Sequence, residues 1–356
     1  MGKVRIGVIG AGVWATTSHL PVLARRSQDV EFVAVCRTGE AEVKAVADQF
    51  GFAIATEDYR EVLDAGVDAC IVSSPAYLHH EHARAALDAG CHVLLEKPVT
   101  VTSADAWDLV ERAQAARLHL VISFGWNYLP TYVAARELLD THGIGDVTGM
   151  SVHMDSGIRE LLLGASLSST GDPNDRADTA TWTSRQISGG GYAQAALPHA
   201  LGLALGLAGI RAKTVHGLVA GGGDTGIELY DAIAVEFTGG AVGTVSGMAH
   251  HLGAALRHEL EIRIFGTEGQ IHLDYCRDYV RLWNTSGADE QPPLPPDAGL
   301  YNCDGPPNAL IDLVQERDAI NRSPGELGAA TVELIEAAYA SAASGLPAHV
   351  DFGRPR

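Results

Sequence analysis

The stretch VRIGVIGAGVWA, residues 4–15, decides the fold of this chain. Its first half, Val4–Ile9, is an apolar run rich in β-branched residues, which predicts a buried strand. The second half matches G-x-G-x-x-A: the first glycine permits a tight turn, the second lets a phosphate approach the backbone, and the alanine lets a helix pack on the strand. The helix N-terminus after such a turn favours a pyrophosphate. We therefore expect a dinucleotide to contact Gly10, Gly12, Val13, Trp14 and Ala15.

Strands and helices alternate after this turn, which is the pattern of parallel strands joined by helices. We expect further strands at Glu31–Cys36, Ala69–Ser73, His92–Leu95 and Leu118–Ser123, and helices at His19–Arg26, Glu40–Phe50, Glu81–Ala89 and Ser103–Ala116. Such units connect in a right-handed sense and cover both faces of a parallel sheet with helices. The sequence thus predicts an α/β Rossmann domain over residues 1–124.

The pattern changes near residue 125, where strands begin to follow one another at hairpin spacing. After a helix at Val133–Asp140, we expect strands at Thr148–Met154, Thr214–Ala220, Ala232–Phe237, Val242–Ala249, Glu259–Phe265, Gln270–Leu273 and Tyr279–Trp283, a loop at Gln291–Pro307, and helices at Asn308–Ile320 and Gly328–Ser344. This predicts an α+β domain over residues 125–356 with a large, mainly antiparallel open sheet, whose last helices pack back on the first domain. An open sheet face suits a homodimer or homotetramer.

The composition excludes several classes of partner. The chain has 25 Lys and Arg residues against 44 Asp and Glu residues, and 25 − 44 gives a formal net charge of −19. An acidic surface repels nucleic acid and anionic membranes, so neither is expected as a partner. The five cysteines are scattered without metal-ligand spacing, which predicts no metal site and a reducing, cytoplasmic location. We expect neither a secretory leader nor a membrane span.

The end of the second strand bears on the type of dinucleotide. NAD sites usually place an acidic residue there to bind the ribose hydroxyls. This chain has Cys36-Arg37-Thr38 instead, with no carboxylate before Glu40. An arginine can bind a 2′-phosphate, so Arg37 and Thr38 favour NADP. The alternative is NAD, with Arg37 in solvent and Glu40 binding the ribose.

Five further motifs support a specific resemblance: Ser74-Pro75-Ala76-Tyr77-Leu78-His79, Glu96-Lys97-Pro98, Trp126-Asn127-Tyr128, Gly189-Gly190-Gly191, and His199 eight residues after the last glycine. With the Gly10 turn, they span nearly the whole chain. The sequence resembles the Gfo/Idh/MocA oxidoreductases, named for glucose–fructose oxidoreductase and inositol dehydrogenase.

The resemblance implies that Lys97 and His199 are catalytic. Lys97 is expected beside the nicotinamide, where an ammonium stabilises the negative charge on the reacting oxygen. His199 is expected to carry the hydroxyl proton, since imidazole titrates in the required range. The resemblance also implies further cofactor contacts at Ser73, Ser74, Pro75, His79, Glu96, Lys97 and Trp182. His80 and His82 are expected to face solvent.

The substrate is expected between the two catalytic residues and the segment Asp155–Gln186. The candidate substrate contacts are Lys97, Trp126, Tyr128, Arg159, Arg185, Tyr192 and His199, with Asp172, Asp175 and Arg176 as further candidates. Many relatives carry an aspartate four residues before the histidine, where this chain has Ala195. This difference predicts a substrate other than the well-known inositols and glucose.

The resulting hypothesis is an NAD(P)-dependent oxidoreductase acting on a secondary alcohol or ketone of a sugar, a cyclitol or a sugar-derived natural product. Two alternatives stay open at this point. One is an epimerase or eliminase that oxidises its substrate transiently with bound cofactor, for which Tyr192 is a weak candidate for the extra base. The other is a non-enzymatic NAD(P)-binding sensor or scaffold.

Overall fold

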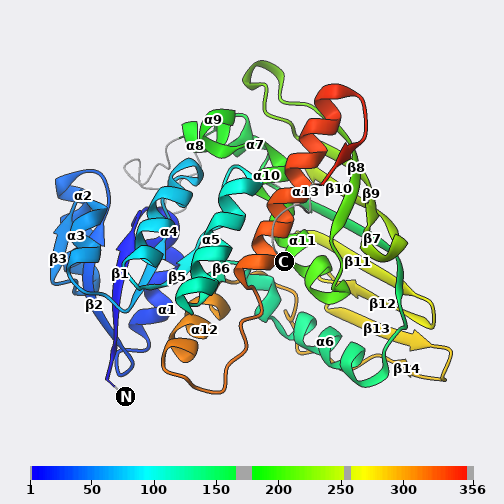
Figure 1. Ribbon diagram of the computed structural model, residues 1–356, viewed down its shortest axis with the longest axis horizontal. Helices are drawn as coiled ribbons and strands as arrows, with labels where there is room; N and C mark the ends of the chain where they lie inside the picture. Colours follow the sequence, from blue (N-terminus) through cyan, green and yellow to red (C-terminus); the bar gives the residue numbers. More distant parts are fainter. Residues whose placement is uncertain (1, 166–178, 252–257, 351–356) are drawn as a thin grey trace. The chain divides into compact units, whose positions relative to one another are not determined.

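The computed structural model describes residues 2–165, 179–251 and 258–350. The described residues form two compact units (Figure 1). The first contains residues 2–125, 179–181 and 302–329, and the second contains residues 126–165, 182–251, 258–301 and 330–350. The candidate residues Asp172, Asp175 and Arg176 lie outside the described residues.

The first unit contains a six-stranded parallel sheet in the order β3-β2-β1-β4-β5-β6. Its strands are β1 (Val4–Ile9), β2 (Val30–Cys36), β3 (Ile54–Thr56), β4 (Ala69–Val72), β5 (His92–Leu95) and β6 (Leu120–Ile122). The central strands are buried on both faces, as a parallel sheet covered by helices requires. The strand order reverses between β1 and β4, and ligands bind at the carboxyl ends of strands beside such a reversal. The predicted α/β Rossmann domain is confirmed.

The helical segments of this unit connect its strands. They are η1 (Ala15–His19), α1 (Leu20–Ala24), α2 (Glu40–Phe50), α3 (Tyr59–Asp64), η2 (Ala76–Leu78), α4 (His79–Asp88) and α5 (Ser103–Ala116). Polar side chains begin two of them: Asp58 accepts the Arg60 N–H ahead of α3, and Thr102 accepts the Asp105 N–H ahead of α5. Strand β3 and helix α3 were not predicted, because a three-residue strand with two exposed positions has no readable apolar period.

Helix α12 (Gly305–Val314) returns late in the chain to this unit, where it packs on β5 and β6 and contacts α1. The predicted bounds, a loop to Pro307 and a helix over Asn308–Ile320, are wrong at both ends. Pro306 and Pro307 lie in the first turn of the helix, where a missing N–H costs nothing.

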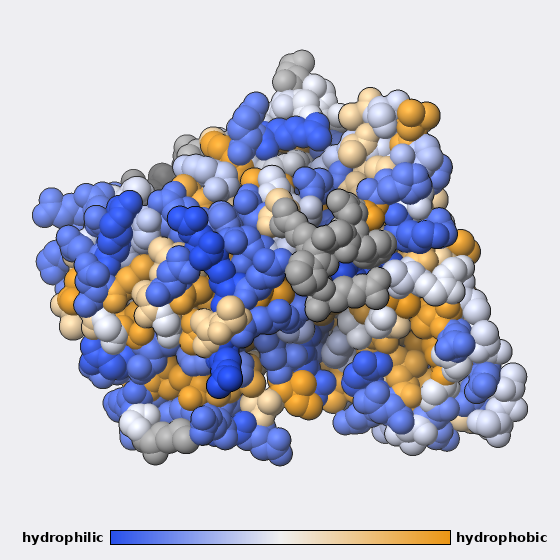
Figure 2. Space-filling model, in the orientation of Figure 1, coloured by the Kyte–Doolittle hydropathy of each residue, from blue (hydrophilic) through white to orange (hydrophobic). Residues whose placement is uncertain are grey.

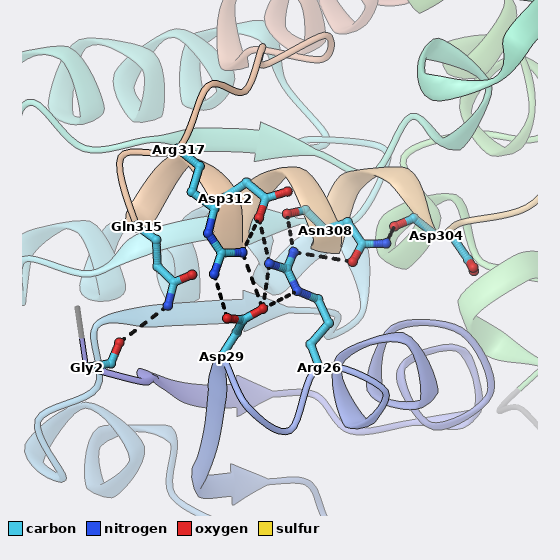
Figure 3. A network of polar contacts seen from close by, with 8 residues as sticks. All are labelled: Gly2, Arg26, Asp29, Asp304, Asn308, Asp312, Gln315 and Arg317. Carbon is cyan, nitrogen blue, oxygen red and sulfur yellow. Dashed lines mark hydrogen bonds and ion pairs between the residues drawn. The ribbon is translucent and has the colours of Figure 1, made fainter.

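A network of hydrogen-bonded ion pairs connects α12 and the residues after it to the loop before β2 (Figure 3). Arg26 donates to Asp29 at 2.9 Å and to Asp312 at 2.6 Å, and Arg317 donates to the same two carboxylates at 2.6 and 2.9 Å. Each arginine therefore bonds to both carboxylates. The two segments are far apart in sequence, since Arg26 and Asp312 are separated by 286 residues.

The second unit contains a nine-stranded sheet in the order β14-β13-β12-β11-β7-β10-β9-β8-β15. Its strands are β7 (Val147–Ser156), β8 (Ala212–Ala220), β9 (Tyr230–Phe237), β10 (Val242–Ala249), β11 (Glu259–Gly266), β12 (Gly269–Asp274), β13 (Tyr279–Asn284), β14 (Asp289–Glu290) and β15 (Ala348–His349). The pairing of β7 with β10 is parallel and the others are antiparallel. The mainly antiparallel open sheet is confirmed.

Buried residues alternate with half-buried residues along β7 and mostly with exposed residues along β9, so one face of this sheet is covered. The largely buried helix α11 (Leu197–Ala208) packs on this sheet at β7 and β11. The other helical segments are η3 (Gly125–Tyr128), α6 (Pro130–His142), α7 (Arg159–Leu162), α8 (Ala180–Thr183), α9 (Arg185–Ser188), α10 (Tyr192–Ala195), η4 (Gly223–Thr225), η5 (Thr238–Gly240) and α13 (Gly325–Ser344).

Hydrophilic residues cover much of the face drawn in Figure 2, in keeping with the acidic composition. Among the residues that the structure describes, no helix is both long enough and apolar enough to cross a bilayer.

Candidate active site

The glycine turn after β1 lies at the carboxyl edge of the first sheet. Gly10 has a φ of 86°, and a Cβ atom there would stand 2.3 Å from the Ser74 backbone nitrogen. Gly12 is different, because a Cβ atom built on it meets nothing within 4 Å. The first glycine is thus needed for close packing of β1 against the end of β4, while the second faces open space. This cradle fits the approach of a dinucleotide pyrophosphate to the backbone.

The loop after β2 carries Arg37, whose side chain is half-buried. Its guanidinium makes no hydrogen bond or ion pair with the residues that the structure describes. The nearby Glu57 carboxylate accepts the Gly39 N–H at 2.5 Å, so one of its oxygens is engaged by the backbone. The loop therefore places the Arg37 guanidinium where the adenosine ribose binds in such folds.

Histidine side chains join the ends of β4 and β5. The His79 ring lies 2.7 Å from both the Pro98 and the Ser74 carbonyl oxygens, through Nδ1 and Nε2 respectively. Burial lowers the pKa of His79, and the two carbonyl groups oppose that effect. His82 was expected in solvent, but it is buried with Nδ1 2.9 Å from the Ser74 hydroxyl. The ends of the two strands are thus held together by side chains from α4.

Glu96-Lys97-Pro98 follows β5 directly, and the Lys97–Pro98 peptide bond is cis. Glu96 is 7% exposed and accepts hydrogen bonds from Trp14 Nε1 at 2.8 Å, from the Lys97 N–H at 3.0 Å, and from His19 Nε2 at 2.7 Å. Desolvation lowers the pKa of Lys97, and the negative charge of Glu96 opposes this effect. The lysine is therefore a half-buried cation backed by a buried carboxylate.

In the second unit, His199 lies among aromatic rings near the start of α11. Its ring centroid is 5.1 Å from that of Trp126 and 5.2 Å from that of Tyr301, both in edge-on geometry. His258 packs edge-on against Trp126 at 5.3 Å. Trp126 itself is 2% exposed and donates its Nε1–H to the Gly299 carbonyl, so its polar atom is already used.

Tyr301 and His258 were not predicted as neighbours of His199. Tyr301 lies about 100 residues and His258 about 60 residues further along the chain, as their numbers show, in segments without a motif. The one available signal was the absence of an acidic residue at position 195, which implied that other polar groups surround the histidine.

Helices α10 and α11 are separate, as the proline at position 198 suggested. Ala196 breaks the helix with φ −120° and ψ −45°, and Pro198 lies in the first turn of α11. Tyr192 therefore does not share a continuous helix face with His199. Its hydroxyl is fully buried, 2.7 Å from the Ser156 Oγ and 3.2 Å from the Met154 carbonyl oxygen, and burial raises its pKa far above the ordinary value. This tyrosine is a structural group rather than an available base.

The remaining predicted substrate or cofactor contacts lie on short helices. Arg159, on α7, donates to the Tyr230 hydroxyl at 2.6 Å. Arg185, on α9, stacks over the Tyr339 ring with 4.9 Å between its Cζ and the ring centroid. Tyr128 and Trp182 are both half-buried. Their roles stay predictions.

Comparison with known proteins identifies the family from both halves of the chain. Residues 4–124 match the model of an oxidoreductase family with an NAD-binding Rossmann fold, and residues 132–272 match the GFO/IDH/MocA C-terminal domain. A dTDP-3,4-didehydro-2,6-dideoxy-alpha-D-glucose 3-reductase of Streptomyces violaceoruber is 31% identical over 302 residues, covering 81% of this chain and 80% of that protein. The D-glucoside 3-dehydrogenase of Escherichia coli (strain K12) is 32% identical over 145 residues, covering 40% and 41%.

Solved structures agree on the fold. Levoglucosan dehydrogenase in complex with NADH and L-sorbose superposes with a TM-score of 0.79 at 18% identity, covering 99% of this chain and 100% of that one. An oxidoreductase domain protein from Kribbella flavida gives a TM-score of 0.78 at 21% identity, with coverage of 99% and 100%. Together with the sequence matches to both domains, these findings confirm the resemblance: the chain belongs to the GFO/IDH/MocA family of oxidoreductases.

Proposed function

We propose that this oxidoreductase transfers hydride between a nicotinamide cofactor and the C3 position of a pyranose sugar, interconverting a ketone and a secondary alcohol. The observation that carries the proposal is Lys97, a cation backed by a buried carboxylate at the carboxyl end of β5, beside the order reversal of the sheet. The names of two relatives, a dideoxy-glucose 3-reductase and a glucoside 3-dehydrogenase, support position 3 of a hexose.

The bound nicotinamide supplies or accepts the hydride. The Lys97 ammonium donates a hydrogen bond to the reacting oxygen and stabilises the negative charge that develops on it. His199 exchanges the proton of that oxygen, as an acid in reduction and as a base in oxidation. The Tyr301 hydroxyl and the His258 ring, which belong to the aromatic cluster of His199, stand in for the carboxylate that this chain lacks at Ala195.

The substrate assignment is tested by following the reduced-nicotinamide absorbance with three ketones: a methyl 3-ketoglucoside, its 4-keto isomer, and a keto-inositol. We expect oxidation of the reduced cofactor with the 3-ketoglucoside at a kcat/KM at least about tenfold above that with the other two, a ratio worth about 1.4 kcal/mol. A preference for the keto-inositol would contradict the assignment of a sugar substrate.

We further propose that NADP is the preferred cofactor, with Arg37 binding its 2′-phosphate. The half-buried guanidinium beside the predicted ribose position supports this, as does the engagement of Glu57 by the backbone. Arg37→Ala is expected to weaken NADPH binding about tenfold to hundredfold in a fluorescence titration, the range for a charged hydrogen bond. NADH binding should stay unchanged. Equal losses for both cofactors would contradict the role of Arg37, and Arg37→Lys provides the charge-preserving control.

We propose that the exposed face of the nine-stranded sheet joins two or more copies of the chain in the cytoplasm. Leu218 on β8 is 75% exposed and Val242 on β10 is 61% exposed, and both belong to the exposed half of an alternating strand pattern. Light scattering on the purified protein tests the assembly, and a monomer at micromolar concentration would contradict it.

A further inference from the structure

Glu96 is predicted to contact the cofactor, and its carboxylate also accepts hydrogen bonds from three groups of the protein. Its Oε1 atom accepts from both Trp14 Nε1 and His19 Nε2, at 2.8 and 2.7 Å, and its Oε2 atom accepts from the Lys97 N–H at 3.0 Å. The His19 side chain is fully buried. Two of these donors belong to the segment that directly follows the glycine turn, and the third belongs to the reactive lysine.

The cluster has the composition of a metal site, since ligand atoms of His19, Glu96 and Cys303 lie within 4.8 Å of one another. Its contacts favour a different function. Both carboxylate oxygens already accept hydrogen bonds, and the Cys303 Sγ lies 3.1 Å from the Ser123 Oγ. The positive charge of Lys97 acts on the same carboxylate and would repel a cation.

We propose that Glu96 is a positioning residue for Lys97: its buried carboxylate keeps the lysine protonated and ties the lysine backbone to the helical segment after the glycine turn. The role of Lys97 in hydride transfer rests on the function proposed above, whereas the control of its charge does not. The contact through Trp14 and His19 also links the lysine to η1, a single π-helical turn, and such turns are frequent at functional sites.

The charges around this carboxylate agree with that role. Burial acts to raise the pKa of Glu96, but the hydrogen bond and charge of His19 and the charge of Lys97 lower it to about 2. Glu96 is therefore ionised at neutral pH. Desolvation lowers the pKa of Lys97, and the charge of Glu96 is the largest effect that opposes this lowering. The other titratable groups of the first unit near the pair are His79 on α4 and Cys303 ahead of α12.

The test measures the charge of Lys97 directly and needs no substrate. Competitive labelling with acetic anhydride across a pH series, read by peptide mass spectrometry, gives the pKa of Lys97 in the folded protein. Glu96→Gln removes the charge with little change of shape, and Glu96→Asp keeps it. Glu111→Gln on the exposed side of α5 removes one carboxylate from the same unit as a matched control.

We expect Glu96→Gln to lower the pKa of Lys97 by about one unit or more, the usual effect of losing an opposite charge at short range. Glu96→Asp and Glu111→Gln should leave it near the wild-type value. In active protein, the alkaline limb of the kcat profile should move to lower pH in Glu96→Gln alone. An unchanged Lys97 pKa in folded Glu96→Gln would overturn the proposal.

Circular dichroism shows whether each variant folds, and Glu96→Met serves as the neutral replacement if the glutamine variant does not. The two proposals fail in different ways. A lowered Lys97 pKa in a protein that reduces no sugar would contradict the proposed function and leave the control by Glu96 intact. Sugar reduction at the expected rate, together with a Lys97 pKa that is the same in Glu96→Gln as in the wild type, would contradict the control by Glu96. It would leave the proposed function intact.

Discussion

Asp231 shows how one residue can set the pH dependence of the second unit. It lies on β9, is 1% exposed, and neither of its carboxylate oxygens has a hydrogen-bond partner among the described residues. Burial, assisted by the charge of Glu228, raises its pKa to about 8. The Glu228 carboxylate is the satisfied member of the pair, because it accepts from the Gly191 N–H at 2.8 Å and from the Tyr339 hydroxyl at 2.5 Å.

The sign of the effect follows from linkage. The folded state holds a proton on Asp231 up to about pH 8, whereas the unfolded chain releases it near pH 4, so the free energy of unfolding falls as pH rises between these values. Asp231→Asn removes this dependence. We expect urea midpoints of the variant to exceed those of the wild type increasingly from pH 5 to pH 8. Parallel pH profiles of the two proteins would contradict the buried neutral acid, and Asp289→Asn, an exposed ion-pair partner on β14, is the control.

The candidate site could be predicted where residues lie next to a strand end in sequence. Glu96 and Lys97 directly follow β5 and His79 begins α4, so sheet topology fixes their approach to the glycine turn. Tyr301 and His258 could not be predicted, because tertiary folding alone brings them to the aromatic cluster of His199. The burial of His82 was missed because its partner, the Ser74 hydroxyl, lies across a loop and follows no helical period.

At the scale of elements, the strand–turn–helix segment at residues 4–19 contains two glycines for which we propose different roles, one in folding and one in cofactor binding. Gly10 has a positive φ and no room for a Cβ atom, whereas Gly12 has open space around its Cα. The motif predicts both glycines equally, and the structure shows that their surroundings differ.

Paired alanine variants test that division. Gly10→Ala must strain the backbone and displace the end of β4, so we expect a lowered melting temperature together with lost NADPH binding. Gly12→Ala should melt as the wild type does but bind NADPH at least about tenfold more weakly, because a methyl group then occupies the approach of the pyrophosphate. Thermal melts and fluorescence titrations measure the two effects. A Gly12→Ala protein that binds NADPH normally would contradict the placement of the phosphate.

The ends of helices and strands could be predicted where the apolar pattern is clear. They could not be predicted where charged residues or prolines set the end of an element. Strands β1 and β5 and helix α5 have the expected bounds. The start of α12 was missed because Pro306 and Pro307 were interpreted as loop residues, although proline suits a first helical turn. The shared carboxylates Asp29 and Asp312 then fix this helix beside the loop before β2, which no local signal reveals.

For the whole molecule, the sequence fold prediction rested on two periods: strand–helix alternation in the first third and hairpin spacing afterwards. Both are confirmed by a parallel six-stranded sheet and a mainly antiparallel nine-stranded sheet. The return of residues 302–329 to the first unit depends on packing against β5 and β6. In the proposed function, helix N–H groups, Arg37 and Lys97 supply the local positive potential that an anionic cofactor needs in a chain with a net charge of −19.

The most direct test of the account compares Lys97→Ala with the wild type in two measurements on one preparation: NADPH binding by fluorescence and NADPH oxidation with the preferred keto sugar. Losing a group that stabilises charge in the transition state costs about 100-fold to 1,000-fold in kcat. We predict a loss of that size or greater, with NADPH affinity within a few-fold of the wild type. A Lys97→Ala enzyme that binds NADPH and reduces the sugar at the wild-type rate would contradict the account.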